Sequence, residues 1–116
     1  MSEITYELGN GVERNKENPE TFYIPSDKVK QALSSGMLAK LMFEPTDPNA
    51  QIGGERMWVL VIEDNYPDFL GALRNNPVML DDLEYGDLVE FTADHVIDVT
   101  VPGPVLEAIR VLSEEL

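Results

Sequence analysis

The chain contains no cysteine, so neither disulfide bonds nor thiolate chemistry can hold the fold or work in it. It has one histidine, His95, and one tryptophan, Trp58. No apolar stretch approaches the roughly 20 residues that a membrane-spanning helix needs. The first ten residues contain Glu3 and Glu7 and lack the basic start and apolar run of a secretory signal. These absences predict a soluble protein of the cytoplasm.

Basic residues are also scarce, since 8 Lys and Arg stand against 22 Asp and Glu, for a net charge of −14. Most of the imbalance lies in residues 63–98, where ten acidic residues accompany the single base Arg74. Such a surface repels phosphate backbones and anionic lipid and attracts basic proteins. The charge therefore predicts a basic protein partner, and no binding to nucleic acid or membrane. Solubility alone is the competing explanation.

The residues that are present suffice for one folded domain. The chain has 116 residues, of which 43% are hydrophobic, with 4 Phe, 4 Tyr and 1 Trp. A domain near this size buries roughly two thirds of the surface that its unfolded chain exposes. We expect a single domain over residues 1–116, with a partly loose segment at 1–20, a core at 21–101 and a terminal helix at 102–116.

Two helices are predicted, one in each half of the chain. Residues 10–20 are polar and have no apolar period, so they predict an exposed loop. Ser26 can cap a helix that ends at Gly36, and its apolar positions have the i, i+3, i+4 spacing of a buried stripe (Val29, Ala32 and Leu33). Prolines at the start of residues 102–116 and an apolar face from Val105 to Leu116 predict a final helix that packs on its own domain.

Short apolar runs separated by turn residues predict a small, barrel-like sheet. The expected strands are Met37–Phe43, Arg56–Glu63, Asp68–Arg74, Leu88–Phe91 and His95–Val99. The second run is rich in β-branched and aromatic residues, which predicts a strand buried on both faces, with Trp58 in the core. Gly71 suggests a bulge or a tight bend in the third strand.

The stretch from Leu73 to Phe91, LRNNPVMLDDLEYGDLVEF, is predicted to be two strand ends joined by a solvated acidic connection. Asn75, Asn76 and Pro77 end one strand, and the turn at Gly86 begins the next. The expected anchors in the core are Leu80, Leu83, Val89 and Phe91. The candidate partner-binding residues are the acids that project from the same segment: Asp81, Asp82, Glu84, Asp87 and Glu90.

Four segments, in this order, resemble a bacterial domain of unknown function, the family DUF2314. They are GERMWVLV at 54–61, GALRNNPV at 71–78, LEYGDLVEF at 83–91 and HVIDV at 95–99. The resemblance covers about Tyr23 to Val99. It implies a small α+β domain with a curled, SH3-like sheet. Together with the strands and helices predicted above, the expected fold class is α+β: a small curled, SH3-like, mostly antiparallel sheet with a helix in the N-terminal half and a C-terminal helix. The resemblance implies no assigned chemistry and no assigned cofactor.

The sequence contains no recognisable nucleophile, metal or phosphate motif. His95 could be a general base with Asp87 and Asp98 nearby, but no Ser, Cys or second His of suitable spacing accompanies it. A histidine at a strand end that bonds a backbone carbonyl is the competing interpretation. The acids between Asp81 and Glu84 lack the alternating ligands and central Gly of a calcium loop. We therefore predict no cofactor and no metal.

Two functional hypotheses remain open at this point. The first is a non-catalytic acidic module that binds a basic partner, as an immunity or antitoxin-type inhibitor of a nuclease would. Such an inhibitor must complement a phosphate-binding cleft, where clustered carboxylates gain affinity and association rate. The second is a small hydrolase or ligand-binding enzyme centred on His95 with Asp87 and Asp98. The expected oligomeric state is a monomer or a weak homodimer.

Overall fold

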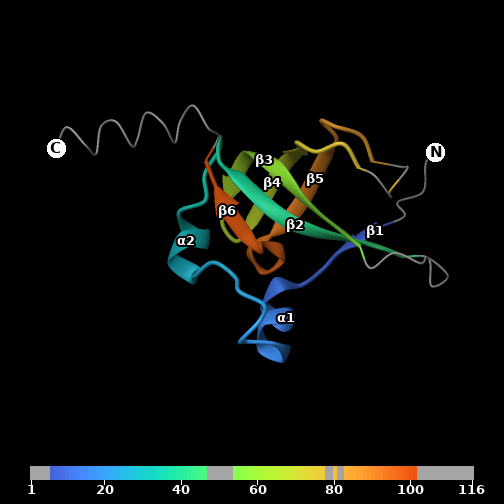
Figure 1. The fold of residues 1–116 in the computed structure, drawn as a ribbon. Helices are drawn as coiled ribbons and strands as arrows, with labels where there is room; N and C mark the ends of the chain where they lie inside the picture. The colour runs from blue at the N-terminus through green and yellow to red at the C-terminus, as the bar shows by residue number, and fades with distance from the viewer. Residues whose placement is uncertain (1–5, 47–53, 78–79, 81–82, 102–116) are drawn as a thin grey trace, which may run out of the picture.

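The architecture comes from a computed structural model of the chain, which describes residues 6–46, 54–77, 80 and 83–101 (Figure 1). Its centre is a six-stranded antiparallel sheet. The strands are β1 (Tyr6–Leu8), β2 (Leu38–Pro45), β3 (Glu55–Asn65), β4 (Asp68–Leu73), β5 (Leu88–Thr92) and β6 (Asp98–Thr100). Strands β1 to β5 follow one another in order across the sheet, and β6 pairs with β2.

The sheet curls because two strands share one edge of β2. One edge of β2 pairs with β3, while the other pairs with β1 at Phe43–Pro45 and with β6 at Leu38–Lys40. A single 3-10 turn, η1 (Ala93–His95), carries the chain from β5 across to β6 (Figure 1). The result is a nearly closed, barrel-like curl. The prediction of a mostly antiparallel, barrel-like sheet is therefore confirmed.

The inward face of the sheet forms the core. Its buried side chains come from four neighbouring strands at alternate positions: Ala39, Leu41, Phe43, Met57, Val59, Val61, Phe69, Leu73, Val89 and Phe91. Phe69 and Phe91 stack beneath β4 and β5 with their ring centroids 5.3 Å apart. Burying one such side chain contributes roughly 1.5–3 kcal/mol. The core thus holds the strands in the register that places the outward side chains.

Strand β3 is buried on one face only, so the prediction of burial on both faces is wrong. Val59 and Val61 are fully buried, but Trp58 and Leu60 between them are half-buried and Arg56 is exposed. An antiparallel strand in a curled sheet turns one face to the core and the other outward. Trp58, expected in the core, lies on the outward face.

A bulge interrupts β3 at Ile62. The pairing with β4 steps from Val61↔Gly71 to Glu63↔Leu70, which leaves Ile62 as the extra residue. The predicted bulge is therefore present opposite Gly71, on the partner strand rather than in β4 itself. A Cβ at Gly71 would lie 3.1 Å from the Leu60 carbonyl oxygen, so the glycine allows this close approach. Beyond the bulge, Glu63 points outward, where an uninterrupted strand would have turned it to the core.

Helix α1 (Gly11–Glu17) lies where the sequence predicted an exposed loop. The side chain of Asn10 caps it by accepting from the N–H of Glu13 at 3.0 Å. The one buried residue of α1 is Gly11, whose Cβ position would lie 2.9 Å from Ile97. The helix therefore packs through a bare backbone, and this contact leaves no apolar period for sequence analysis to detect.

Helix α2 (Asp27–Gln31) begins as predicted, because Ser26 accepts from the N–H of Val29 at 3.3 Å. It is shorter than expected and ends before Gly36, which has a positive φ of 95° in the turn into β2. Val29 and Ala32 are exposed, so the predicted apolar stripe is wrong at those two positions, whereas Leu33 is buried. The predicted helix at 102–116 lies outside the described residues. In the parts of the chain that are described, no helix is long and apolar enough to cross a bilayer.

Candidate functional site

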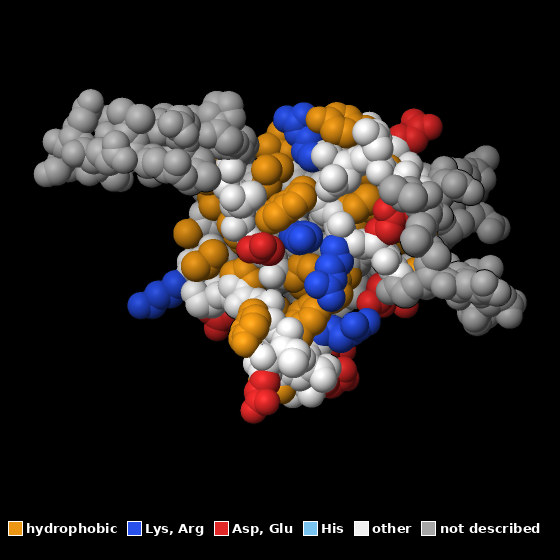
Figure 2. All heavy atoms as spheres, in the orientation of Figure 1, with side chains coloured by type: hydrophobic (Ala, Val, Ile, Leu, Met, Phe, Trp, Pro, Cys, Tyr) orange, Lys and Arg blue, Asp and Glu red, His pale blue; other side chains and the backbone are white. Residues whose placement is uncertain are grey.

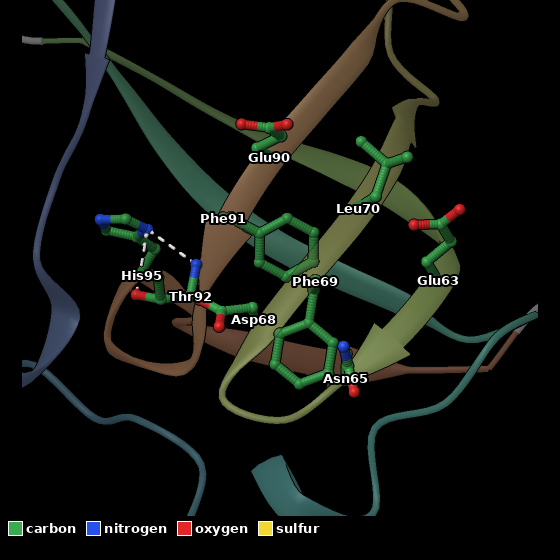
Figure 3. Close-up of a pocket in the computed structure, with 9 residues that line it drawn as sticks. All are labelled: Glu63, Asn65, Asp68, Phe69, Leu70, Glu90, Phe91, Thr92 and His95. Carbon is green, nitrogen blue, oxygen red and sulfur yellow. Dashed lines mark hydrogen bonds between the residues drawn. The ribbon is translucent and has the colours of Figure 1, made fainter.

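The outward face of β3, β4 and β5 carries a small grid of polar side chains. Cross-strand pairing aligns two rows of three residues: Glu63, Leu70 and Glu90 in one, and Asn65, Asp68 and Thr92 in the other. Neighbouring strands lie about 4.8 Å apart, so each row spans roughly 10 Å. We call these six residues the acidic face. Figure 3 shows Glu63 and Glu90 on either side of Leu70.

The acidic face lines a shallow hollow with a volume of about 430 Å³. Phe69, Phe91 and His95 complete its lining, and no Lys or Arg takes part. Its three carboxylates come from three different strands, while Leu70 supplies an apolar, half-buried centre. Because the strands are fixed by the core beneath them, the backbone positions that carry the carboxylates keep the spacing of the sheet. The arrangement suits a cationic group that has an apolar stem.

His95 borders the hollow from η1, so the prediction that it begins a strand is wrong. Its Nδ1 accepts the backbone N–H of Thr92 at 3.0 Å, with the Thr92 hydroxyl 3.4 Å away. The expected bond to a backbone carbonyl is therefore replaced by a bond from a backbone N–H. Burial lowers the pKa of His95 below its ordinary value, and the nearby Asp94 carboxylate partly opposes this shift. Burial and the hydrogen bond from the Thr92 N–H therefore both favour the imidazole form in which Nδ1 is unprotonated and accepts.

The structure does not bring His95 together with Asp87 and Asp98. Asp87 precedes β5 and accepts from the N–H of Glu84 at 2.9 Å, whereas His95 follows β5 at its other end. Five strand residues separate the two ends by roughly 16 Å. Asp98 lies opposite Lys40 in the β2–β6 pair, and its Oδ1 accepts the N–H of Val99 at 2.8 Å. The hollow beside His95 includes neither aspartate.

The five candidate partner-binding acids fall into three groups. Glu90 lies on the acidic face, Glu84 and Asp87 lie in the turn before β5, and Asp81 and Asp82 lie outside the described residues. The predicted anchors beneath them, Leu80, Leu83, Val89 and Phe91, are all buried, which confirms that part of the prediction.

Sequence reasoning selected neither Glu63 nor Asp68 as a site residue. Both belong to the acidic run of residues 63–98, but only cross-strand pairing places them beside Glu90. The bulge at Ile62 decides which side of β3 Glu63 occupies. The signal that could have found them is therefore the register of β3 against β4.

The outward face of β2 and the first half of β3 has a different character. Lys40 lies over the Trp58 ring and Arg56 over the Phe22 ring, each 5.4 Å from the ring centroid. Lys40 and Arg56 line a second hollow of about 260 Å³, together with Phe22, Tyr23 and Asp98. Figure 2 shows Lys and Arg side chains gathered among hydrophobic ones near the middle of the face on which β2 and β6 lie in front. Both cationic side chains therefore already have an aromatic partner within the chain.

The described residues contain no group of three or more His, Cys, Asp or Glu side chains that could hold a metal ion. Glu63, Asp68 and Glu90 line one hollow without meeting that condition. Their common chemistry is therefore a diffuse negative potential over an exposed face. Such a potential favours cationic side chains of a partner.

One family model matches residues 12–102, that of the uncharacterized proteins conserved in bacteria called DUF2314. The chain belongs to this family. The match includes α1 from its second residue and all of β2 to β6, so the DUF2314 region begins earlier than the resemblance at Tyr23 suggested. Searches of curated proteins and of solved structures gave no match.

Proposed function

We propose that this DUF2314 protein is a non-catalytic binding module that engages a basic protein partner through its acidic face. The observation that carries the proposal is the convergence of Glu63, Asp68 and Glu90 on one exposed hollow whose lining contains no Lys or Arg. Carboxylates arranged in this way attract a cationic surface and raise its association rate. Their placement on strands over a packed core keeps the binding geometry preorganised.

Leu70 gives the acidic face a second element of recognition. It lies between Glu63 and Glu90 in the same cross-strand row and is half-buried. Lys and Arg side chains lay their methylene stems on apolar surface and keep the charged head in a polar site. A basic side chain of the partner would rest its stem on Leu70 and place its head between the two glutamates.

The sharper form of the proposal is an immunity or antitoxin-type inhibitor of an enzyme that acts on nucleic acid. The phosphate-binding cleft of such an enzyme is basic, and a fixed row of carboxylates complements it. The family description assigns no activity, and the proposal does not rest on it. The cysteine-free sequence supports the cytoplasm as the compartment, and we expect a monomer or weak homodimer.

The finer description of the fold is part of the same proposal. The 3-10 turn η1 between β5 and β6, and the pairing of β6 with β2, support an SH3-like form of the barrel with α1 and α2 outside it. Small barrels of this kind present strand faces and edges to partners. The hydrolase hypothesis lacks comparable support, since His95 Nδ1 is occupied and Asp87 and Asp98 lie away from it.

The test compares two triple variants of equal net charge. One carries Glu63→Gln, Asp68→Asn and Glu90→Gln, and the control carries Gln at three exposed acids elsewhere: Glu7, Glu17 and Glu20. Proteins captured by each from lysate of the source cells are identified at low and at moderate salt. We expect the first variant to lose basic partners that the control retains, together with the salt response of capture. Equal behaviour of the two variants would show that the acidic face is only a solvated surface.

A further inference from the structure

Strand β5 lies at an edge of the sheet. It pairs with β4 on one side, and within the described residues no strand pairs with its other side. The N–H of Ala93 donates to the Pro67 carbonyl at 2.9 Å, and the Asp87 carbonyl accepts from Leu73 at 2.8 Å. Backbone groups alternate in direction along a strand. The N–H and C=O groups of the even-numbered residues, Leu88, Glu90 and Thr92, therefore point away from β4.

These outward groups differ in availability. The N–H of Thr92 is taken by His95 Nδ1. Leu88 is 64% exposed and Glu90 is also exposed, and across the described ranges neither backbone N–H has a hydrogen-bond partner. Unpaired groups on an exposed edge form a template for another strand. Because His95 occupies the N–H of Thr92, the N–H groups that remain for an added strand are those of Leu88 and Glu90.

We infer that this edge of β5 docks an extended basic segment of the partner as an added antiparallel strand. The inference rests on the proposed function and specifies which residues of the partner segment would lie opposite Leu88 and Glu90. A short edge strand with a charged side chain discourages pairing with most strands. The charge on Glu90, with Glu63 and Asp68 behind it, leaves a basic strand as the complementary one.

The pairing geometry predicts the composition of the docked segment. A side chain directly opposite Glu90 would have its Cβ about 4.5–5.5 Å from that of Glu90, which favours Lys or Arg there. The side chain opposite Leu88 would meet an exposed apolar surface. Antiparallel pairing is slightly more stable per residue than parallel pairing. The segment should therefore read basic, any residue, apolar from its N-terminus to its C-terminus.

The probe is a short synthetic peptide in which every second residue is Thr. The residues between the threonines are Lys and Val in turn. One version is N-methylated at the Lys and Val residues and another at the Thr residues. In the proposed register the Lys and Val N–H groups face β5, so methylating them should weaken binding at least about tenfold. Methylation at Thr should leave the affinity within about threefold of the parent peptide. Amide hydrogen exchange at Leu88 and Glu90 should slow when the parent peptide binds.

The outcomes separate this inference from the proposed function. Equal binding of both methylated peptides, with unprotected Leu88 and Glu90 amides but a clear salt response, would overturn strand addition and leave the acidic face intact as a binding surface. No binding of the parent peptide at low salt would also overturn it, whatever partners the lysate experiment identifies.

A protein variant provides an independent check on the edge. Glu90→Pro removes an N–H that points away from β4 and so leaves the β4–β5 pairing available. Glu90→Gln removes the same charge and keeps the N–H. We expect the proline variant to bind the parent peptide about tenfold more weakly than the glutamine variant. Equal affinities in the two folded variants would contradict the inference, and the peptide comparison stands if the proline variant does not fold.

Discussion

The outward surface of a single sheet has two halves that use charge in different ways. On β2 and the first half of β3, Lys40 and Arg56 lie against aromatic rings, so they are engaged within the molecule. On the second half of β3 and on β4 and β5, the carboxylates Glu63, Asp68 and Glu90 share a hollow whose lining contains no Lys or Arg. The difference teaches that net charge alone does not indicate where a partner would bind. Under the proposed function, we expect binding where carboxylates have no cationic partner among the described residues.

The largest effect should come from removing the support beneath the acidic half. Phe69 is buried, stacks on Phe91 and occupies the inward side of β4. Phe69→Ala should lower the free energy of unfolding by about 3–5 kcal/mol, because it removes apolar contact and leaves a cavity. Urea denaturation measures this change. A loss below about 1 kcal/mol would mean that the two halves do not depend on a common core.

An intermediate effect is expected at the border of the acidic face. His95→Ala leaves the Thr92 N–H without its acceptor and should cost about 1 kcal/mol, as the loss of other capping groups does. The wild type should also lose stability as pH falls through the ordinary histidine pKa toward the lowered pKa of folded His95. The sign follows because the unfolded chain binds the proton more readily than the folded one.

The control for this pH dependence is Asp94→Asn. The Asp94 carboxylate raises the pKa of folded His95. Removing this carboxylate should therefore extend to lower pH the range over which the protein loses stability. Thermal unfolding of the three proteins across the acidic range compares them directly. A His95→Ala variant that retains the full wild-type decline near the histidine pKa would assign the decline to other groups.

The smallest effects should distinguish the two halves by sign. Neutralising Glu63, Asp68 and Glu90 should change stability by no more than about 0.5 kcal/mol per residue, in the stabilising direction, because it relieves self-repulsion in a chain of net charge −14. Lys40→Gln and Arg56→Gln should each destabilise by about 0.5–1 kcal/mol, since each loses a contact with a ring. Chemical denaturation of these variants tests the comparison, and the same sign in both halves would refute it.

Local chemistry made the stretch from Leu73 to Phe91 predictable. The turn at Gly86, which has a positive φ of 93°, needs a residue that tolerates the left-handed region, and glycine marks it in the sequence. The anchors Leu80 and Leu83 are apolar residues within an acidic segment, and burial is the only favourable place for them. The ends of β4 and β5 were therefore found close to their observed positions.

Features that depend on tertiary contacts were not predictable in the same way. Helix α1 packs through Gly11 against Ile97, which is distant in sequence, and carries no apolar stripe. The acidic face depends on the register of β3 with β4, which shifts at Ile62. Helix propensity and alternation describe one segment at a time. Neither contains the information that pairs Glu63 with Leu70 and then with Glu90.

The extra residue at Ile62 reverses which alternate residues of β3 face the core. The first half of the strand sends Val59 and Val61 into the core, and the second half turns Glu63 and Asn65 outward, because the extra residue interrupts the two-residue alternation once. The alternate residues of one strand thereby belong to the core before the bulge and to the acidic face beyond it. If Ile62 were instead paired with Leu70 in a regular ladder, Glu63 would lie opposite Phe69 and turn toward the phenylalanine stack, so one unpaired residue separates a negatively charged exterior from a carboxylate aimed at the interior.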